Sequence, residues 1–527
     1  MGFTVPEKEI ILKEGAAPVN IGTIEMEVST NTLDEVKVTS KKAMLNTSID
    51  RKVYNTSQDI MAQSGSASDI LRNVPSVEVD IEGNVSLRGA GDMMILINGR
   101  PSPLMGKNKA EALRQIPANT IERVEVITNP SARFRPDGST GIINIVLKKN
   151  TKAGFNGNVT GNFGNKERAN GSVTINYKTT KWNSFATYSI RQDERNRFGN
   201  TDRKFTDSIT GAVTGFYKET FRSKARPLSN LLRGGLDYTI DDKNSIGISA
   251  NYLTTTQTRN DVLNRTFFNK NNIVTSQSDR LRNAPAIEYE KDATVYWQHN
   301  FNKEDRELRI EATASSQSED EKNYYTNNYY FPIKKTIPDF NSVNQIEYNQ
   351  QVTADYISPI GEDAKMELGY AGSFIQQDID FYTSTYDTSA QKLIKNMLLS
   401  NPFKFNQTVH AIYGTYFKTI NKFSYSLGLR AEQAFVKSNL VSKDSIIDNQ
   451  YFQVYPTIHL AYKLNNGELQ LNYSKRVNRP EGDDMNPFTE YIDPLNLRAG
   501  NPKLLPEYIQ WLYNYYAKIK RFGILNY

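Results

Sequence analysis

Residues 121–149 read IERVEVITNPSARFRPDGSTGIINIVLKK, and this stretch decides the fold of the first part of the chain. Apolar and β-branched residues dominate Ile121–Ile127 and Gly141–Lys149, which is the pattern of buried strands. The segment between them contains Pro130, Pro136 and Gly138, residue types that favour turns. The stretch therefore predicts two strands separated by a segment rich in turns.

The sequence just upstream continues this mixed pattern. Residues 69–101 read DILRNVPSVEVDIEGNVSLRGAGDMMILINGRP. A short helix led by Ser68 and stopped by Pro75 is expected first, because Ser favours a helix start and Pro ends a helix. The strands predicted after it are Val85–Gly89 and Met93–Pro101, with an Asn98-Gly99 hairpin turn. Residues 59–150 are therefore expected to form one small α/β domain, since their number is ordinary for a domain.

Beyond Gly154 the helical signal nearly disappears, and apolar residues alternate with polar ones. Clear examples are Val173, Ile175 and Tyr177; Ile246, Ile248, Ala250 and Tyr252; and Phe423, Tyr425, Leu427 and Leu429. A period of two over such a length indicates strands that are buried on one face only.

The connections between these strands alternate between short and long. The short turns are at 178–181, 241–244, 302–305, 361–364, 421–422 and 465–467, and the longer linkers are near 196–227, 259–285, 321–345, 385–404, 441–450 and 480–505. An up-and-down transmembrane barrel with short periplasmic turns and long outer loops requires this alternation. A soluble β-sandwich does not require this alternation. Such a sandwich, with the aromatic strand residues in its core, remains the alternative to a barrel. Strands such as Lys365–Thr385 exceed the length that crosses lipid and should project beyond it.

Composition excludes several functional classes. The chain has 527 residues, no Cys and 3 His, which excludes disulfide frameworks, thiolate metal sites and cysteine nucleophiles. Mean hydropathy is −0.59, and no apolar run approaches the length of a membrane-spanning helix. The net charge of +6 comes from dispersed Lys and Arg, so it does not indicate nucleic-acid binding. The 57 aromatics, by contrast, fit the interfacial girdles of a β-barrel in lipid.

The quoted motifs resemble those of the TonB-dependent receptors of bacterial outer membranes. Residues 69–101 resemble the opening of the family's plug domain, and residues 121–149 resemble its closing motif. The family's common closing motif has a GPxSALYG-like core, whereas residues 129–134 here read NPSARF. This departure resembles a Bacteroidetes-type subgroup of outer-membrane β-barrel proteins. The resemblance implies a mainly β fold: a small α/β plug domain followed by an incomplete antiparallel transmembrane β-barrel.

The same resemblance divides the whole chain. Residues 1–32 resemble the tail of a carboxypeptidase-regulatory-like domain, and 33–58 a TonB-box-like segment with its linker. Residues 59–150 correspond to the plug and 151–527 to the barrel. About 14 strands follow the plug, with a further one beginning near Phe522, whereas barrels with a plugged lumen use about 22. We therefore expect the chain to lack C-terminal barrel strands, as it also lacks a signal peptide.

The candidates for energy coupling and for plug release come from this resemblance and from charge. The TonB-box candidate is Leu33, Asp34, Glu35, Val36, Lys37, Val38 and Thr39, an alternating run able to add as a strand to a partner's sheet edge. An ordinary linker strand is the alternative. Contacts between plug and barrel wall are expected from Arg88, Arg100, Glu122 and Glu125, the two acids being placed on one face of a strand. Solvated surface charges are the alternative for these four residues.

Ligand candidates lie in the predicted outer loops. The aromatic set is Tyr324, Tyr325, Tyr329, Tyr330 and Phe331, which would stack on a ligand or form a rim belt. The basic set is Arg195, Arg197, Arg203, Lys204, Arg222, Lys224 and Arg226, which would attract an anionic ligand or lipopolysaccharide. The acidic set Glu481, Asp483 and Asp484 would hold Ca²⁺ or form a solvated loop. His299, His410 and His459 fall on different strands and are expected to be structural. For the acidic set the solvated loop is the favoured interpretation, so no catalytic residue, metal ligand or cofactor site is expected.

Three functional hypotheses follow. The first is a TonB-dependent outer-membrane receptor that imports a ligand with energy from TonB. The second is a passive or structural outer-membrane barrel without energy coupling, and the third is a soluble β-sandwich adhesin. The first implies as partners TonB with its inner-membrane energising complex, outer-membrane lipid and lipopolysaccharide, and a small ligand such as a siderophore, glycan or peptide. Neither an enzyme nor a nucleic-acid partner is implied.

Overall fold

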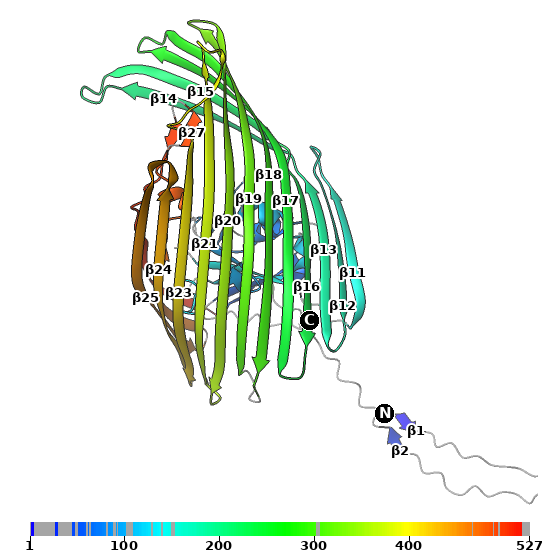
Figure 1. Ribbon diagram of the computed structural model, residues 1–527. Helices are drawn as coiled ribbons and strands as arrows, with labels where there is room; N and C mark the ends of the chain where they lie inside the picture. The colour runs from blue at the N-terminus through cyan, green and yellow to red at the C-terminus, as the bar shows by residue number, and fades with distance from the viewer. Residues whose placement is uncertain are drawn as a thin grey trace, which may run out of the picture. The chain divides into compact units, whose positions relative to one another are not determined.

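The computed structural model describes most of the chain between residues 51 and 518, together with three short strands before residue 51 (Figure 1). The gaps after residue 51 are 60–61, 63–64, 81–82, 88–90, 92, 102–108, 128–129, 139–140, 149–152, 302–305, 466, 489 and 494–495. Met1–Ala43 and Met44–Tyr527 form two separate units. In the first unit, β1 (Gly2–Thr4) pairs antiparallel with β2 (Glu27–Ser29).

The second unit begins with an α/β domain, residues 44–148, which we call the plug. Its six-stranded sheet has the order β3-β4-β9-β10-β7-β8, in which β7 and β10 are parallel. The strands are β3 (Leu45–Thr47), β4 (Arg51–Asn55), β7 (Met94–Ile97), β8 (Arg100–Pro101), β9 (Ile121–Ile127) and β10 (Ile142–Leu147), with a separate hairpin of β5 (Val77–Val79) and β6 (Val85–Leu87). The helical segments are η1 (Thr56–Gln58), α1 (Ala67–Arg72), α2 (Lys109–Gln115) and η4 (Ala118–Thr120).

Local sequence explains the boundaries of these elements. Helix α1 begins after Ser66, not at the predicted Ser68, because the Asp69 carboxylate accepts bonds from the Ser66 amide (2.9 Å) and hydroxyl (2.8 Å). The β7–β8 hairpin turns at Asn98 and Gly99, both with positive φ, as that pair predicts. Among the described helices, none combines the length and apolar character needed to cross a membrane.

A large antiparallel sheet, which we call the wall, follows the plug and curves around it (Figure 1). It consists of 17 strands. Their bounds are β11 (Gly154–Phe163), β12 (Ala169–Lys178), β13 (Trp182–Gln192), β14 (Arg195–Thr206), β15 (Val213–Ala225), β16 (Leu228–Thr239), β17 (Asn244–Asn269), β18 (Val274–Asn300), β19 (Glu307–Phe331), β20 (Lys335–Ile360), β21 (Ala364–Asp387), β22 (Lys392–Lys395), β23 (Asn401–Ile420), β24 (Phe423–Leu440), β25 (Ser445–Leu464), β26 (Gly467–Asn478) and β29 (Glu507–Lys518). Beside it lie η5 (Val441–Lys443), α3 (Gly482–Met485) and the short hairpin β27 (Glu490–Asp493) and β28 (Asn496–Arg498).

The predicted number of wall strands is confirmed for the described residues. Strand β13 continues as β14 after a break at 193–194, and β15 continues as β16 after a break at 226–227. Counting each of these pairs once and leaving the four-residue β22 aside gives fourteen strands across the wall. Within the described chain, β11 pairs with β12 and β29 with β26, and no pairing joins β11 to β29. The strand predicted near Phe522 lies outside the described residues.

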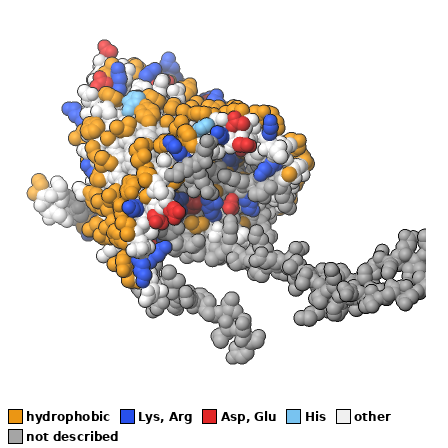
Figure 2. Space-filling model, turned by 90° about the horizontal axis from the view of Figure 1, so that it is seen from below, with side chains coloured by type: hydrophobic (Ala, Val, Ile, Leu, Met, Phe, Trp, Pro, Cys, Tyr) orange, Lys and Arg blue, Asp and Glu red, His pale blue; other side chains and the backbone are white. Residues whose placement is uncertain are grey.

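The two faces of the wall differ as the period of two predicts. One row of paired residues, Ile248, Val295, Ala312 and Val352, crosses four strands and faces outward. The neighbouring inward row is Asn251, Asp292, Ser315 and Asn349. Figure 2 shows hydrophobic side chains spread over the outside of the wall, which is the surface that a barrel turns toward lipid.

The predicted short turns at 178–181, 241–244, 361–364 and 421–422 are confirmed, whereas 302–305 and residue 466 lie outside the described residues. Three of the six predicted long linkers are wrong. The segments near 196–227, 259–285 and 321–345 are mainly strand, because β14, β15 and β17–β20 continue past the apolar belt. Outside lipid both faces of a strand meet water, so the alternation of apolar and polar residues fades although the hydrogen-bonded ladder continues. We call β14, β15 and residues 259–284 and 323–341 the canopy; Figure 1 shows these upper ends bending to one side.

Candidate functional site

The plug touches the wall most closely through the turn-rich segment between β9 and β10. Its main chain joins β26: the Val477 amide donates to the Pro136 carbonyl (3.0 Å), and the Gly138 amide donates to the Val477 carbonyl (3.2 Å). Gly138 has φ +87°, a conformation that favours glycine, so the sequence places glycine where this turn requires it. The segment is therefore attached to the wall as a short length of parallel ladder.

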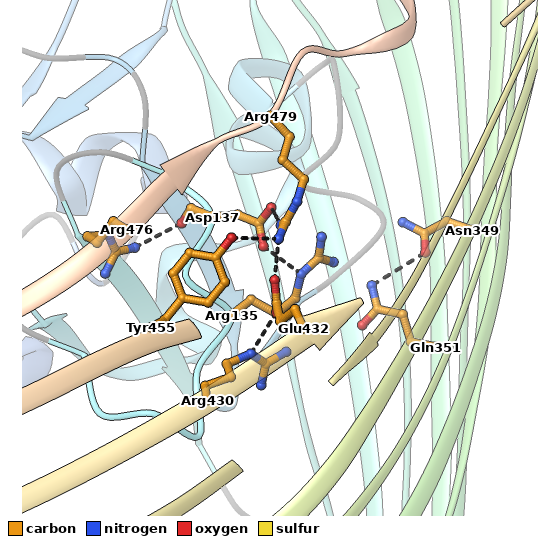
Figure 3. Close-up of polar contacts among 9 residues, drawn as sticks. All are labelled: Arg135, Asp137, Asn349, Gln351, Arg430, Glu432, Tyr455, Arg476 and Arg479. Atoms are coloured by element: carbon orange, nitrogen blue, oxygen red, sulfur yellow. Dashed lines mark hydrogen bonds and ion pairs between the residues drawn. The ribbon is translucent and has the colours of Figure 1, made fainter. Parts of the chain in front are cut away.

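An ionic cluster surrounds this ladder (Figure 3). The Arg479 guanidinium bonds the plug's Asp137 with one nitrogen and Glu432 of β24 with another. Each acid also has a second cation: Arg135 contacts Asp137 at 3.0 Å, and Arg430 contacts Glu432 at 2.7 Å. Arg479 thus bridges an acid of the plug and an acid of the wall.

Arg476 adds further bonds to the same turn. Its guanidinium donates to the main-chain carbonyls of Gly138 (2.5 Å) and Asp137 (2.8 Å). The plug turn is therefore held by main-chain ladder bonds, by side-chain bonds to its carbonyls and by the ion pair at Asp137.

The cluster is buried, so its members depend strongly on one another. The side chains of Arg479, Glu432 and Arg430 are 4%, 2% and 3% exposed. Burial alone would raise the pKa of Asp137, but Arg135 and Arg479 outweigh it and hold that pKa well below its usual range. A buried ion pair of this kind is costly to break on one side, because the remaining charge loses its partner.

Close packing accompanies the ionic contact. A Cβ added to Gly428 of β24 would lie 2.9 Å from Ala132 Cβ of the plug and 2.3 Å from Thr457 Oγ1. Real Cβ atoms do not approach that closely, so Gly428 leaves the space that Ala132 occupies. The predicted closing motif therefore fits the wall both by shape and by charge.

Two other contacts attach the plug elsewhere. Arg133 pairs with Asp355 of β20 at 3.4 Å, and Asp355 also accepts a bond from Tyr413 of β23. On the opposite part of the wall, Arg191 of β13 donates to the Arg114 carbonyl of α2 at 3.3 Å. Figure 3 also shows Asn349 and Gln351 on β20, which bond each other at 3.4 Å.

The arrangement offers attachment rather than catalysis. Within the described part of the chain, no group of three or more acidic or His residues is placed to hold a metal ion. The three His bond Asn244, Tyr370 and Asn472 on neighbouring strands, at 2.9, 2.8 and 2.9 Å respectively. What the site can do chemically is hold two parts of the molecule together with polar bonds that can reform.

The structure places the predicted contact residues differently. Leu33–Thr39 and Arg88 lie outside the described residues, and Arg100 is described only as part of β8. Glu125 bonds Arg51, Arg123 and Asn144 inside the plug, at 2.9, 2.8 and 2.9 Å. It therefore serves the plug's own sheet instead of the expected contact with the wall.

Glu122 and Glu125 were expected to lie on one face of a strand, but they lie on opposite faces. Residues three apart on a strand point to opposite sides, and Glu122 pairs with Arg123 at 3.3 Å while Glu125 is buried. A contact between Glu122 and the wall stays a prediction.

The predicted ligand residues lie in the canopy. Tyr324, Tyr325, Tyr329, Tyr330 and Phe331 belong to strand β19 and not to a loop. Tyr325 is buried under the Arg280 guanidinium, 3.7 Å from the ring centre, whereas Tyr330 is exposed and donates to Asp279 at 2.7 Å. Because neighbouring residues of a strand face opposite sides, these aromatics do not form one platform. Their role in ligand binding stays a prediction.

The two charged sets are also placed in ordered structure. Arg195, Arg197, Arg203 and Lys204 lie on β14, Arg222 and Lys224 on β15, and Arg226 just after β15. Lys224 and Arg226 pair with Glu194 at 3.0 and 3.2 Å. Asp484 accepts the Glu481 amide at 3.3 Å, and Asp483 accepts from Gln377 at 3.4 Å. These acids therefore shape the short helix α3.

Sequence reasoning missed Asp137, Glu432 and Arg479. Asp137 stands within the quoted closing motif, but its pairing with Arg479 joins residues 342 positions apart, which spacing alone cannot reveal. One signal was present in the wall: Arg430 and Glu432 occupy inward positions of a strand whose outward positions are apolar. Paired charges at adjacent inward positions indicate a contact with something inside the barrel.

Two family profiles match the chain. One, described as the TonB-dependent receptor plug domain, matches residues 44–142, and the other, described as an outer membrane protein beta-barrel family, matches residues 299–524. Among solved structures, the copper transporter OprC is 14% identical, with a TM-score of 0.57; the alignment covers 89% of this chain and 68% of that one. The siderophore receptor PiuA from Acinetobacter baumannii is 13% identical, with a TM-score of 0.50, and the corresponding coverages are 83% and 67%.

These likenesses agree with the architecture. At such identities the solved structures show the fold alone, which is a plug inside a β-barrel. The two matched families are a receptor plug domain and an outer-membrane barrel, and they place the protein in the bacterial outer membrane. The chain therefore carries the plug domain of the TonB-dependent receptors, followed by an outer-membrane β-barrel.

Proposed function

We propose that the protein imports a small ligand across the outer membrane with energy received from TonB. The observation that carries this proposal is the attachment of the plug by polar bonds: the ladder at Pro136–Gly138 and the bridge through Arg479. Polar bonds of this kind hold at rest, yet they can break under an applied force and reform afterwards. A plug meant only to seal the barrel would gain more from an apolar contact, because replacing buried ion pairs by apolar residues is often neutral or stabilising.

The parts of the chain take roles in this proposal. Residues 1–32 are the tail of a carboxypeptidase-regulatory-like domain, and Leu33–Thr39 engages TonB from the periplasm. The residues between Thr39 and β3 transmit the pull to the plug. The barrel, residues 151–527, forms the passage together with the plug. The canopy, with its aromatic and basic residues, receives the ligand, and its outer cations contact lipopolysaccharide. TonB and its inner-membrane energising complex are the protein partners, and a siderophore, glycan or peptide is the ligand class.

The test compares growth of the native bacterium on defined iron and glycan sources. The strain carries either the intact gene, no gene, or a gene in which residues 33–39 are replaced by Gly and Ser. The replacement keeps the length of the linker, so only the side chains of the segment change. A source on which growth needs the gene identifies the ligand class, and we expect the replacement to abolish growth on that source.

Two outcomes would contradict the proposal. Growth of the replacement strain at the level of the intact strain would show that the segment is not needed for uptake. Steady ion conductance of the purified protein in a planar bilayer without TonB would favour a passive barrel, because a seated plug should block the passage until it is pulled.

A further inference from the structure

The segment after β26 turns back along the inner face of the wall. We call the described residues within 479–501 the strap; residues 489, 494 and 495 lie outside the description. Its helix α3 packs against β21, β23 and β24, where Met485 is 2% exposed. The residues that surround Met485 are Ile379, Phe403, Phe405 and Val436. Val436 faces the same side of β24 as Arg430 and Glu432, so the strap occupies the inner face that also holds the plug.

Helix α3 fits its seat tightly. A Cβ added to Gly482 would lie 1.9 Å from the Gln377 side-chain oxygen and 3.2 Å from the Phe405 ring. The Gln377 amide also donates to Asp483 at 3.4 Å. A larger side chain at position 482 therefore displaces either the end of the Gln377 side chain or α3 itself, and the Phe405 ring leaves little room beside them.

The two limbs of the strap are bonded to each other. The Asn501 amide donates to the Asp484 carbonyl at 2.7 Å, and the Gly500 amide donates to the Asn486 carbonyl at 2.6 Å. Gly500 also has no room for a Cβ, which would lie 2.2 Å from the Asp484 oxygen. The ends of the strap therefore move together with α3.

Arg479 is the first residue of the strap and also the bridge of the ionic cluster. Only Pro480 and Glu481 separate it from α3. Proline fixes its own φ, and Glu481 is extended, with φ −81° and ψ 165°. Two extended residues span about 7 Å and have almost no slack. A displacement of α3 is therefore passed to the Arg479 backbone.

From these contacts we infer that the strap is a positioning element for plug release: the seat of α3 sets the place of Arg479, and Arg479 holds the plug. Gly482 and Met485 are its positioning residues. A ligand that binds better when α3 has left its seat shifts the protein toward the released state by that difference in affinity. The inference rests on the proposed function only in treating plug release as a step of import. The coupling itself is a property of the purified protein.

The test is hydrogen exchange of the purified protein in detergent micelles, without TonB or ligand. Gly482→Val is introduced as a wedge beneath α3. The Gly138 amide, which bonds Val477, reports on the plug, and the Met485 amide, which bonds the Glu481 carbonyl at 3.2 Å, reports on α3. We expect exchange at both amides to rise about ten- to a hundredfold, the factor that corresponds to losing one hydrogen bond to a charged group.

Two further variants make the result specific. Gly199→Val on β14 is the matched control, because no atom lies within 4 Å of its added Cβ, and it should leave both amides unchanged. Gln377→Ala removes the atom that collides with the wedge, so the double variant with Gly482→Val should recover slow exchange at Gly138. A merely destabilised barrel would not be restored by removing a second side chain.

Each remaining outcome would overturn the inference. Faster exchange at Met485 with no change at Gly138 would show that the strap moves without moving the plug. Equal acceleration in β17–β20 would show general loosening, and failure of Gln377→Ala to restore protection would exclude the seat as the cause. No change at either amide would show that α3 has more room against Gln377 and Phe405 than the distances from Gly482 indicate. Because TonB is absent throughout, these results are independent of the growth test above.

Discussion

Replacing Arg479 by Met is expected to loosen the plug more than any single change outside the cluster. Methionine keeps the length and apolar stem of the side chain but removes the guanidinium that joins Asp137 to Glu432. Breaking a buried ion pair on one side costs about 3–5 kcal/mol. Here each acid keeps one cation, Arg135 at 3.0 Å or Arg430 at 2.7 Å, so we expect a loss near the lower limit, about 3 kcal/mol.

That loss corresponds to more than a hundredfold change in the equilibrium of plug release, since about 1.4 kcal/mol is tenfold. The assay is urea titration of the purified protein in detergent. The chain has no Cys, so a dye on a single cysteine at exposed Glu78 reports on the plug alone. With the usual urea dependence of about 1–3 kcal/mol per M, the midpoint should fall by about 1–3 M.

The control is Lys322→Met, which breaks the exposed pair between Lys322 and Asp320, 3.7 Å apart. Exposed pairs contribute little, so its midpoint should stay close to that of the parent. A double-mutant cycle that combines Arg479→Met with Asp137→Asn should give a coupling energy of about 0.5–3 kcal/mol. If Arg479→Met shifts the midpoint no further than Lys322→Met, the bridge does not hold the plug and the reasoning is refuted.

Three other changes test neighbouring parts of the site with the same dye. Folding lowers the pKa of Asp137, so its bonds stabilise the plug above about pH 4, and this stabilisation is lost as the pH falls toward the folded pKa. Between about pH 5 and pH 3 the urea midpoint of the parent should therefore fall more steeply than the midpoint of Asp137→Asn. Parallel plots of midpoint against pH for the two proteins would contradict this. Gly428→Val should lower the urea midpoint, because the new side chain meets Ala132 of the plug. The control Gly161→Val meets no atom within 4 Å and should leave the midpoint unchanged. Equal midpoints for the two variants would refute the close packing of Gly428 against Ala132. Tyr54→Phe removes a 2.8 Å bond to Asp59 inside the plug and should cost about 1–2 kcal/mol, so an unchanged midpoint would show that this bond adds nothing.

The plug and the wall were predictable from sequence for different reasons. Strand β9 was predicted with its observed bounds, Ile121–Ile127, because its β-branched apolar residues favour a strand and turn residues follow it. The wall strands were predictable because lipid on one side and water on the other impose a period of two. The tight turns were marked by Asn, Asp and Gly, residues that tolerate the positive φ observed at Asn421 and Gly361.

What could not be predicted depends on contacts between distant residues. The canopy strands were mistaken for loops, since a strand in water needs no apolar face. Glu125 was assigned to the wall because its charge was visible and its partners Arg51 and Asn144 were not. Arg479 was not singled out, because its role comes from Asp137 and Glu432, which lie far from it in the chain. The assignment to a Bacteroidetes-type subgroup stays a prediction.

The length of the canopy strands has a consequence for how a solute meets the protein. Strand β18 has 27 residues, or about 90 Å at about 3.3 Å per residue, whereas about 9–11 residues suffice to cross lipid. Electrostatic influence decays over about 8 Å at physiological ionic strength. The outer end of the canopy therefore stands several screening lengths above the anionic membrane surface. An approaching charged solute responds there to the receptor's own residues, and its rate of encounter is set by the protein and not by the lipid.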